Sequence, residues 1–239
     1  MDENLPLAPQ LFQGVFSFNQ KERSLFGKAD TAAYENWIYA ERGPLASPIL
    51  FGGPVELLSR NSPLFLVLVW VPVILYLVSQ GFFSSSLLFF LANFGGGVAL
   101  WSIMEYTLHR FFFHSTPTRN WGVLLHFIFH GIHHRYPTDA GRLLMPPLVG
   151  LLVLAILRTV LLPFLSLSAL GALLAGCSSG YCTYDLCHYL LHHHRIPLLA
   201  NLQRLHKDHH RFHSFNFGVS PLGRVWDRVF CTGSGSSPH

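Results

Sequence analysis

Histidines in metal-ligand spacing are the part of this sequence that could do chemistry. Fourteen of the fifteen histidines fall between His109 and His213, and residues 1–108 contain none. Neutral imidazole is the commonest metal ligand among side chains. We therefore expect a polynuclear metal site built from ten spaced histidines: His109, His114, His130, His133, His134, His188, His192, His206, His209 and His210.

The spacing predicts how these imidazoles meet. Residues three and four apart share one face of a helix, so the H-x-x-H-H blocks at 130–134 and 206–210 are each expected to converge on one point. His109 and His114 are five apart, about 140° around a helix, so the helix must end or bend between them. One zinc ion takes four ligands, so ten imidazoles favour two metal ions with about five each.

The other histidines have a simpler explanation. A lone histidine is more often a structural residue than a ligand, and this applies to His126, His193, His194 and His213. The alternative role for one or two of them is to orient a ligand. His239 lies in the C-terminal tail and is expected to have no role.

The composition predicts the elements that position these histidines. Half of the 239 residues are hydrophobic and only 12% are charged, which is too apolar for an ordinary soluble domain. A membrane-spanning helix needs roughly 20 apolar residues. Four stretches are long enough or nearly so, and they form two hairpins with turns near Gly81 and at 166–168: residues 63–80, 82–104, 143–165 and 166–191.

Charge predicts the orientation of these spans. Fifteen of the sixteen Lys and Arg residues precede the first stretch, lie between the hairpins or follow the last stretch, and the hairpin turns carry none. By the positive-inside rule, both termini and the middle loop are cytosolic, and so is every histidine block. We therefore expect an all-α membrane protein with four transmembrane helices in two hairpins and a cytosolic helical cap that holds the dimetal site.

Three regions follow from this organisation. Residues 1–62 are expected to form a cytosolic N-terminal arm, partly helical at 31–41. Residues 63–232 form the membrane domain with its cap. Residues 233–239 are expected to be a disordered tail.

The membrane setting bears on the choice of metal. Nitrogen-rich ligation with open positions suits iron as well as zinc. The unactivated C–H bonds of a lipid tail need a strong metal-bound oxidant, which favours iron. The sequence lacks the Glu-x-x-His motif of bundle-type di-iron carboxylate sites, so its carboxylates are expected to orient the imidazoles instead: Glu105, Asp139, Asp185, Asp208 and Asp227.

These motifs resemble the fatty acid hydroxylase superfamily, over roughly residues 60–230. The matching segments are E-Y-T-L-H-R-F-F-F-H at 105–114, H-F-I-F-H-G-I-H-H-R-Y-P-T-D at 126–139, Y-D-L-C-H-Y-L-L-H-H at 184–193 and H-K-D-H-H at 206–210. The sequence is most similar to the fatty acid 2-hydroxylases that act on sphingolipid N-acyl chains. It lacks the His-Pro-Gly-Gly haem motif of a cytochrome b5 domain, as plant-type members do, and has Cys231 where a glycine is usual.

The resemblance implies a division of the ten ligands. One metal would take the first set, His109, His114, His130, His134 and His209. The other would take the second set, His133, His188, His192, His206 and His210.

The resemblance also implies an activity and partners. It implies an endoplasmic reticulum enzyme whose di-iron site uses O2 to hydroxylate C2 of a very-long-chain acyl group in a ceramide. Electrons would come from cytochrome b5 and its NADH-dependent reductase, because the sequence has no flavin, haem or NAD motif. Zinc could replace iron in purified protein, and no nucleic-acid partner is expected.

Several alternatives stay open at this stage. A lipid desaturase or a sterol methyl oxidase would share the hydrogen-abstraction step. A zinc-dependent lipid amide hydrolase would need only one metal ion. A zinc-binding transporter would place its ligands near the membrane midplane rather than at one rim.

Overall fold

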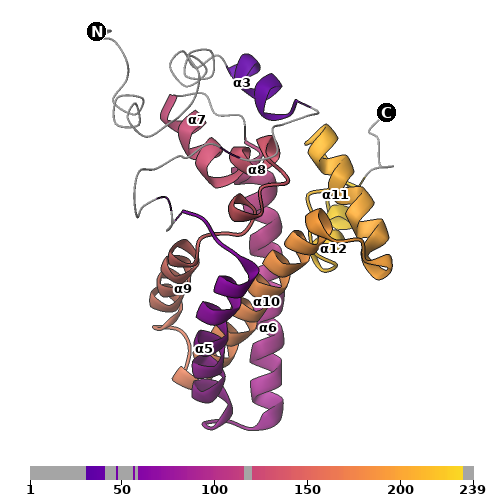
Figure 1. Cartoon of the computed structure of the whole chain (residues 1–239). Coiled ribbons are helices and arrows are strands. Elements are labelled where there is room, and N and C mark those ends of the chain that lie inside the picture. Colours follow the sequence, from indigo (N-terminus) through magenta and orange to yellow (C-terminus); the bar gives the residue numbers. More distant parts are fainter. Residues whose placement is uncertain (1–30, 41–46, 48–55, 57–58, 116–119, 234–239) are drawn as a thin grey trace, which may run out of the picture.

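The computed structural model describes residues 31–40, 47, 56, 59–115 and 120–233. These residues form helices and no strand, which confirms the all-α prediction. Short helices gather at one end of the longer ones (Figure 1). Most of the predicted N-terminal arm, and the tail with His239, lie outside the described residues.

Four long helices form the apolar part of the molecule: α5 (Pro63–Phe82), α6 (Leu87–Thr107), α9 (Pro147–Leu161) and α10 (Leu167–His193). Three segments of the described chain are long and apolar enough to cross a membrane: Pro63–Phe82, Leu87–Phe113 and Ala140–Leu161. α10 is not among them. It packs along α6 and α5, and fourteen of its 27 residues are buried. Its polar side chains can therefore face protein, and the fourth span stays a prediction.

Serine and proline residues set the helix starts. The hydroxyls of Ser62, Ser86 and Ser166 accept hydrogen bonds from the backbone N–H three residues on, which satisfies a free donor at each N-terminus. α9 begins at Pro147, later than the expected 143, because proline is suited to the first turn of a helix. Gly81 lies inside α5 rather than in the following turn.

Glycines allow α10 to lie close to its neighbours. A Cβ atom on Gly97 of α6 would lie 1.9 Å from the carbonyl oxygen of Leu173, and one on Gly176 would lie 1.9 Å from that of Phe94. Gly95 has nothing within 4 Å of the same position. Within the Gly95–Gly97 run, Gly97 is the residue that the α6–α10 contact requires.

Short helices build the cap over the end of this bundle. An aromatic core joins α3 to the segment 123–136, with Tyr34 and Ile38 completely buried. The helix expected at 31–41 is thus present at Thr31–Ile38 and packs on the cap. The cap elements are α7 (Asn120–His126), α8 (Ile132–Arg135), α11 (Ala200–Phe212) and α12 (Gly223–Val229), with the π-helical segments η1 (Leu108–Phe113) and η2 (Phe127–Gly131) and the 3-10 turns η3 (Ala140–Arg142) and η4 (Pro197–Leu199).

The close approach of α6 and α10 can be tested by adding one methyl group. Gly97→Ala should lower the free energy of unfolding by about 1–3 kcal/mol, because its Cβ meets backbone atoms that cannot move aside. The matched control Gly95→Ala should leave stability unchanged or slightly higher. Thermal unfolding of both variants in detergent, followed by size-exclusion chromatography, measures the difference. Equal stability of the two variants would contradict the packing.

Candidate metal centre

The structure brings the ten spaced histidines together. The first set, His109, His114, His130, His134 and His209, offers five ring nitrogens within 4.8 Å of one another, and the second set, His133, His188, His192, His206 and His210, offers five more. These are the two sets that the resemblance implies. Nitrogens on opposite sides of one metal ion would be separated by up to about 4.2 Å, given metal–nitrogen bonds of about 2.0–2.1 Å. Each set is therefore close to the size of a metal site.

The nitrogens of each set point at one another. In the first set, the Nε2 atom of His130 lies 2.9 Å from the Nε2 atoms of both His114 and His134. In the second set, the Nε2 atom of His206 lies 3.0 Å from that of His188 and 2.7 Å from that of His192. Lone pairs that converge in this way repel unless a proton or a cation lies between them, so the arrangement fits a bound cation.

A π turn places His109 and His114 in the same set. The backbone N–H of His114 donates to the carbonyl of His109, 3.1 Å away, at the end of η1. A five-residue hydrogen bond widens the helix, so residues five apart come onto nearly one face. The helix also ends at Phe113, between the two histidines, as expected, and the wider turn before that end brings them together.

The two H-x-x-H-H blocks divide between the sets. Residues four apart, such as His130 and His134, stay together, while His133 between them joins the other set. α11 does the same, with His209 in the first set and its neighbours in the second. Spacing alone predicted a single convergence point for each block, and this was wrong because adjacent residues on a helix point about 100° apart.

Burial keeps the cap imidazoles in the neutral form that binds metal. Desolvation is the main cause that lowers the pKa of His130, His134, His206 and His210 well below the usual value, and neighbouring imidazoles lower it further. Metal ligation requires the deprotonated ring nitrogen. These side chains thus need no proton loss near neutral pH before a metal ion binds.

Backbone carbonyls of a loop after α11 orient two of the imidazoles. His109 donates from Nδ1 to the carbonyl of Phe217 at 2.6 Å, and His209 donates to the carbonyl of Phe215 at 2.9 Å. With its proton on Nδ1, each ring presents the lone pair of Nε2 to the first set. Asp227 of α12 holds this loop by accepting from the backbone N–H groups of Phe217 and Gly218, at 2.9 and 3.0 Å.

No pattern of residue types marks this loop, and carboxylates were predicted in its role. Asp227 contacts the backbone of the loop and not an imidazole. Glu105 lies 3.5 Å from the backbone N–H of Val219 on the same loop. Asp139 and Asp208 pair instead with Arg60 and Arg204. A search for side-chain motifs cannot find carbonyl acceptors, because every residue has one.

The additional histidines lie outside both sets in the described chain. The Tyr34 hydroxyl and His126 Nδ1 are 2.7 Å apart, and Tyr39 stacks on His213 with ring centroids 3.9 Å apart. His193 stacks on Tyr189 at 4.6 Å. These contacts fit the structural explanation, in which the rings pack around the centre.

An apolar cavity of about 380 Å³ opens beside the histidines. His130 of the first set and His133 and His188 of the second set lie in its wall. Ligand sites of proteins are commonly about 300–1,000 Å³ and mostly apolar. Most of the remaining wall is apolar: Phe113, Ile128, Phe129, Ile132, Leu143, Leu144, Met145, Pro146, Leu148 and Val149.

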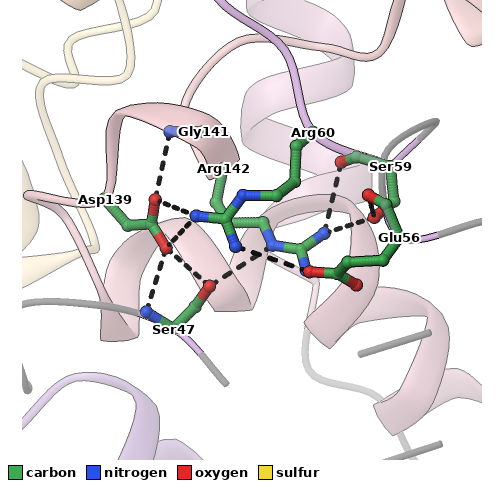
Figure 2. A network of polar contacts seen from close by, with 7 residues as sticks. All are labelled: Ser47, Glu56, Ser59, Arg60, Asp139, Gly141 and Arg142. Carbon is green, nitrogen blue, oxygen red and sulfur yellow. Dashed lines mark hydrogen bonds and ion pairs between the residues drawn. The ribbon is translucent and has the colours of Figure 1, made fainter. Parts of the chain in front are cut away.

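Ion pairs fix the side of this cavity that leads into α9 (Figure 2). Arg142 donates to the carbonyl and the hydroxyl of Ser59 and pairs with Glu56, and its side chain is only 3% exposed. Arg60 donates to both oxygens of Asp139, at 2.7 and 2.9 Å. The segment before α5 is thereby tied to the turn that precedes the cavity wall.

Hydrogen bonds and charge set the ionisation of Asp139 in this network. Burial alone would raise the pKa of its carboxyl, but hydrogen bonds from Ser47 and the charge of Arg60 outweigh burial and lower the pKa. Asp139 is therefore a charged partner in the network.

Comparison with known proteins gives the chain a family. The family model described as fatty acid hydroxylase matches residues 94–232. The chain belongs to the fatty acid hydroxylase family. A solved structure of full-length scs7p, in which only the hydroxylase domain is visible, superposes with a TM-score of 0.80 at 32% identity, covering 100% of this chain and 87% of the other.

Two named relatives are similar to this chain over most of its length. Ceramide very long chain fatty acid hydroxylase SCS7 of Saccharomyces cerevisiae is 34% identical over 77% of this chain, which spans only 48% of that relative. Dihydroceramide fatty acyl 2-hydroxylase FAH2 of Arabidopsis thaliana is 33% identical over 83% of this chain and 85% of its own length. The chain thus spans about half of the yeast relative and most of the plant relative.

The division of the histidines predicts metal stoichiometry. His209→Ala and His133→Ala should each reduce bound metal from two ions per chain to about one, because each removes a ligand from a different set. His213→Ala, outside both sets, should retain two. Elemental analysis of the purified variants measures the ratio. Unchanged metal content in both ligand variants would refute the assignment.

The buried ion pairs predict a difference in stability. Arg142→Met should lower the free energy of unfolding by about 1–3 kcal/mol, because Glu56 loses the nearer of two cationic partners and keeps Arg60 at 3.4 Å. Arg204→Met breaks an exposed pair with Asp208, 3.7 Å apart, and should cost less than about 1 kcal/mol. Thermal unfolding in detergent compares the two, and a small effect of Arg142→Met would show that the network is not needed for stability.

Proposed function

We propose that this protein is a membrane-bound, O2-dependent hydroxylase that acts on C2 of the very-long-chain acyl group of ceramides. One observation carries the proposal: two five-imidazole sets lie beside a single apolar cavity. The printed names of the relatives, a ceramide very long chain fatty acid hydroxylase and a dihydroceramide fatty acyl 2-hydroxylase, support the choice of substrate.

The ten histidines of the two sets are the proposed ligands of two metal ions, iron in the active enzyme and zinc in some purified samples. A bound iron pair would supply O2 activation and the oxidising power needed for an unactivated C–H bond. Overall, one oxygen atom enters the C2–H bond as a hydroxyl and the other leaves as water, with two electrons and two protons from a donor.

The chain's own residues bind and orient the reactants. The apolar wall of the cavity holds the acyl chain and excludes water. Phe215 and Phe217 hold His209 and His109 through their carbonyls, which fixes the ring orientation and leaves Nε2 free for the metal. Arg142 keeps the cavity wall in place through the ion-pair network.

The proposed membrane arrangement uses all four long helices as spans, paired as two hairpins, in the endoplasmic reticulum. The distribution of Lys and Arg supports a cytosolic location of the cap and both termini. α10 can be a span despite its polar residues, because α5 and α6 shield much of its surface.

Electrons are proposed to come from cytochrome b5 and its NADH-dependent reductase. Exposed basic residues cluster around the helix that carries His206 and His210, and a basic face attracts an acidic electron donor. The exposed cations on α11 and α12 and in the segment before α11 are Arg195, Arg204, Lys207, Arg211 and Arg228.

Sphingolipid analysis tests the proposed reaction. In a yeast strain that lacks its own 2-hydroxylase, this protein should produce 2-hydroxyacyl ceramides, and His133→Ala should produce none. Mass spectrometry of the lipid extract detects the added oxygen and its position. Products with a new double bond, or oxidised sterols, would instead indicate a desaturase or a sterol oxidase.

A further inference from the structure

Tyr39 joins the N-terminal arm to the first set of histidines. It directly follows α3, and its backbone N–H donates to the carbonyl of Glu35 at 3.0 Å. α3 is fixed on the cap, because Tyr34 and Ile38 are completely buried in the aromatic core. Tyr39 lies outside residues 94–232, over which the family model matches, so that match gives it no role.

The hydroxyl of Tyr39 contacts His114 on the side of the ring that faces away from the first set. It lies 3.4 Å from the Nδ1 atom of His114. The Nε2 atom of the same ring lies 2.9 Å from that of His130 and 3.3 Å from that of His109, so Nε2 faces the centre of the set. Nδ1 therefore carries the proton and donates to the Tyr39 hydroxyl. This hydrogen bond is long, so the position of Tyr39 must be held by other contacts.

Contacts with three imidazoles hold the ring of Tyr39. The ring lies parallel to that of His213, with centroids 3.9 Å apart and 7° between the planes. It meets the ring of His134 edge-on at 5.1 Å and lies nearly parallel to that of His114 at 6.2 Å. Among the described residues, Tyr39 has no ring contact or hydrogen bond with the second set. Its contacts with ligands therefore concern one of the two metal sites.

The backbone of His213 shows that the stack on Tyr39 is held in place. Its φ is 27°, in the left-handed region that favours glycine, and its N–H donates to the carbonyl of His209 at 2.7 Å, just after the end of α11. A residue with a side chain stays in this region only where surrounding contacts fix it. The stack is such a contact, so the N-terminal arm and the end of α11 hold each other over the first set.

A polar cavity of about 350 Å³ borders the same ligand. Tyr39, His114 and His213 lie in its wall, together with the charged side chains of Glu35 and Arg110. Water in this cavity competes for the Nδ1–H group of His114. A mobile water molecule does not fix the orientation of a ring, whereas a hydroxyl on a packed side chain does. The orientation of His114 is thus expected to depend on Tyr39.

We infer that Tyr39 is a positioning residue for the metal ion of the first set. Its hydroxyl orients His114, its ring packs on His114 and His134, and His213 keeps that ring in place. This inference rests on the metal ligation within the proposed function and adds a role for the N-terminal arm. It makes the two ions unequal, because the arm supports the retention of one and not of the other.

Metal release tests this role one ion at a time. His133→Ala and His209→Ala are expected to hold one ion each, in the first and the second set respectively, so each background isolates one site. Tyr39→Phe removes only the hydroxyl, Tyr39→Leu also removes the ring, and both are placed in both backgrounds. Tyr189→Phe is the matched control, because Tyr189 stacks on His193, outside both sets.

The experiment measures the rate at which an excess of a water-soluble, chromophoric chelator removes zinc from the purified, zinc-loaded protein. In the His133→Ala background, Tyr39→Phe should speed release about threefold to tenfold, as expected for the loss of one neutral hydrogen bond. Tyr39→Leu should speed it about tenfold to a hundredfold, the range typical of residues that orient a metal ligand. In the His209→Ala background both should leave the rate unchanged, and Tyr189→Phe should leave it unchanged in both.

Two further measurements use the chain with both sets intact. Tyr39→Leu should speed the release of one of the two zinc ions and leave the other unchanged. His213→Ala should keep both ions in the absence of chelator, and should speed the release of one ion by less than Tyr39→Leu does, because it removes the stack but keeps the hydroxyl.

The outcomes separate this inference from the proposed function. Equal acceleration of both ions would mean that the substitutions loosen the whole cap, and would overturn the positioning role of Tyr39. Unchanged release of the first-set ion would do the same, and would leave the proposed reaction standing. A chain that shows the expected effect of Tyr39 but yields no 2-hydroxyacyl product would overturn the proposed reaction and leave the role of Tyr39 standing. Wild type that binds no metal would overturn both.

Discussion

The two histidine sets are interleaved along the chain, and the rest of the cap depends on this constraint. α8 carries His133 of the second set next to His134 of the first, and α11 places His209 between two residues of the second set. Neighbouring residues point about 100° apart, so each helix must lie between the two sets, with one side chain directed to each. Rotation of either helix would move one imidazole closer to its set and move another away from the other set.

Contacts on both sides of the metal centre prevent α8 and α11 from rotating. The aromatic core around Tyr34 and Phe127 packs against the segment that contains α8. On the other side, Asp227 fixes the loop whose carbonyls accept from His109 and His209. The backbone of Cys231, which follows α12, has a φ of 51°, where glycine is the least strained residue. Cysteine is accommodated here in a conformation that favours glycine.

Much of this architecture could be predicted from the sequence, and the exceptions have identifiable causes. The ten histidines were found because their spacing is regular, and the two sets came from resemblance rather than geometry. The π turn at 108–113 could not be predicted, because a one-residue change in hydrogen-bond register leaves no pattern in residue type. The carbonyls of Phe215 and Phe217 were missed for a similar reason. Hydropathy marked α10 as a span, which stays a prediction, and its polar residues fit a position buried among other helices.

Charged and polar groups beside the cavity are balanced within the protein. Arg142 and Glu56 satisfy each other and neighbouring serines, so this part of the wall is fixed before any ligand arrives. Asp185, which also lies in this wall, is buried and has the hydroxyl of Tyr181 and the backbone N–H of Met145 as hydrogen-bond donors. The polar groups on this side of the cavity are thus held by the protein itself, so the shape of the apolar wall does not depend on a ligand.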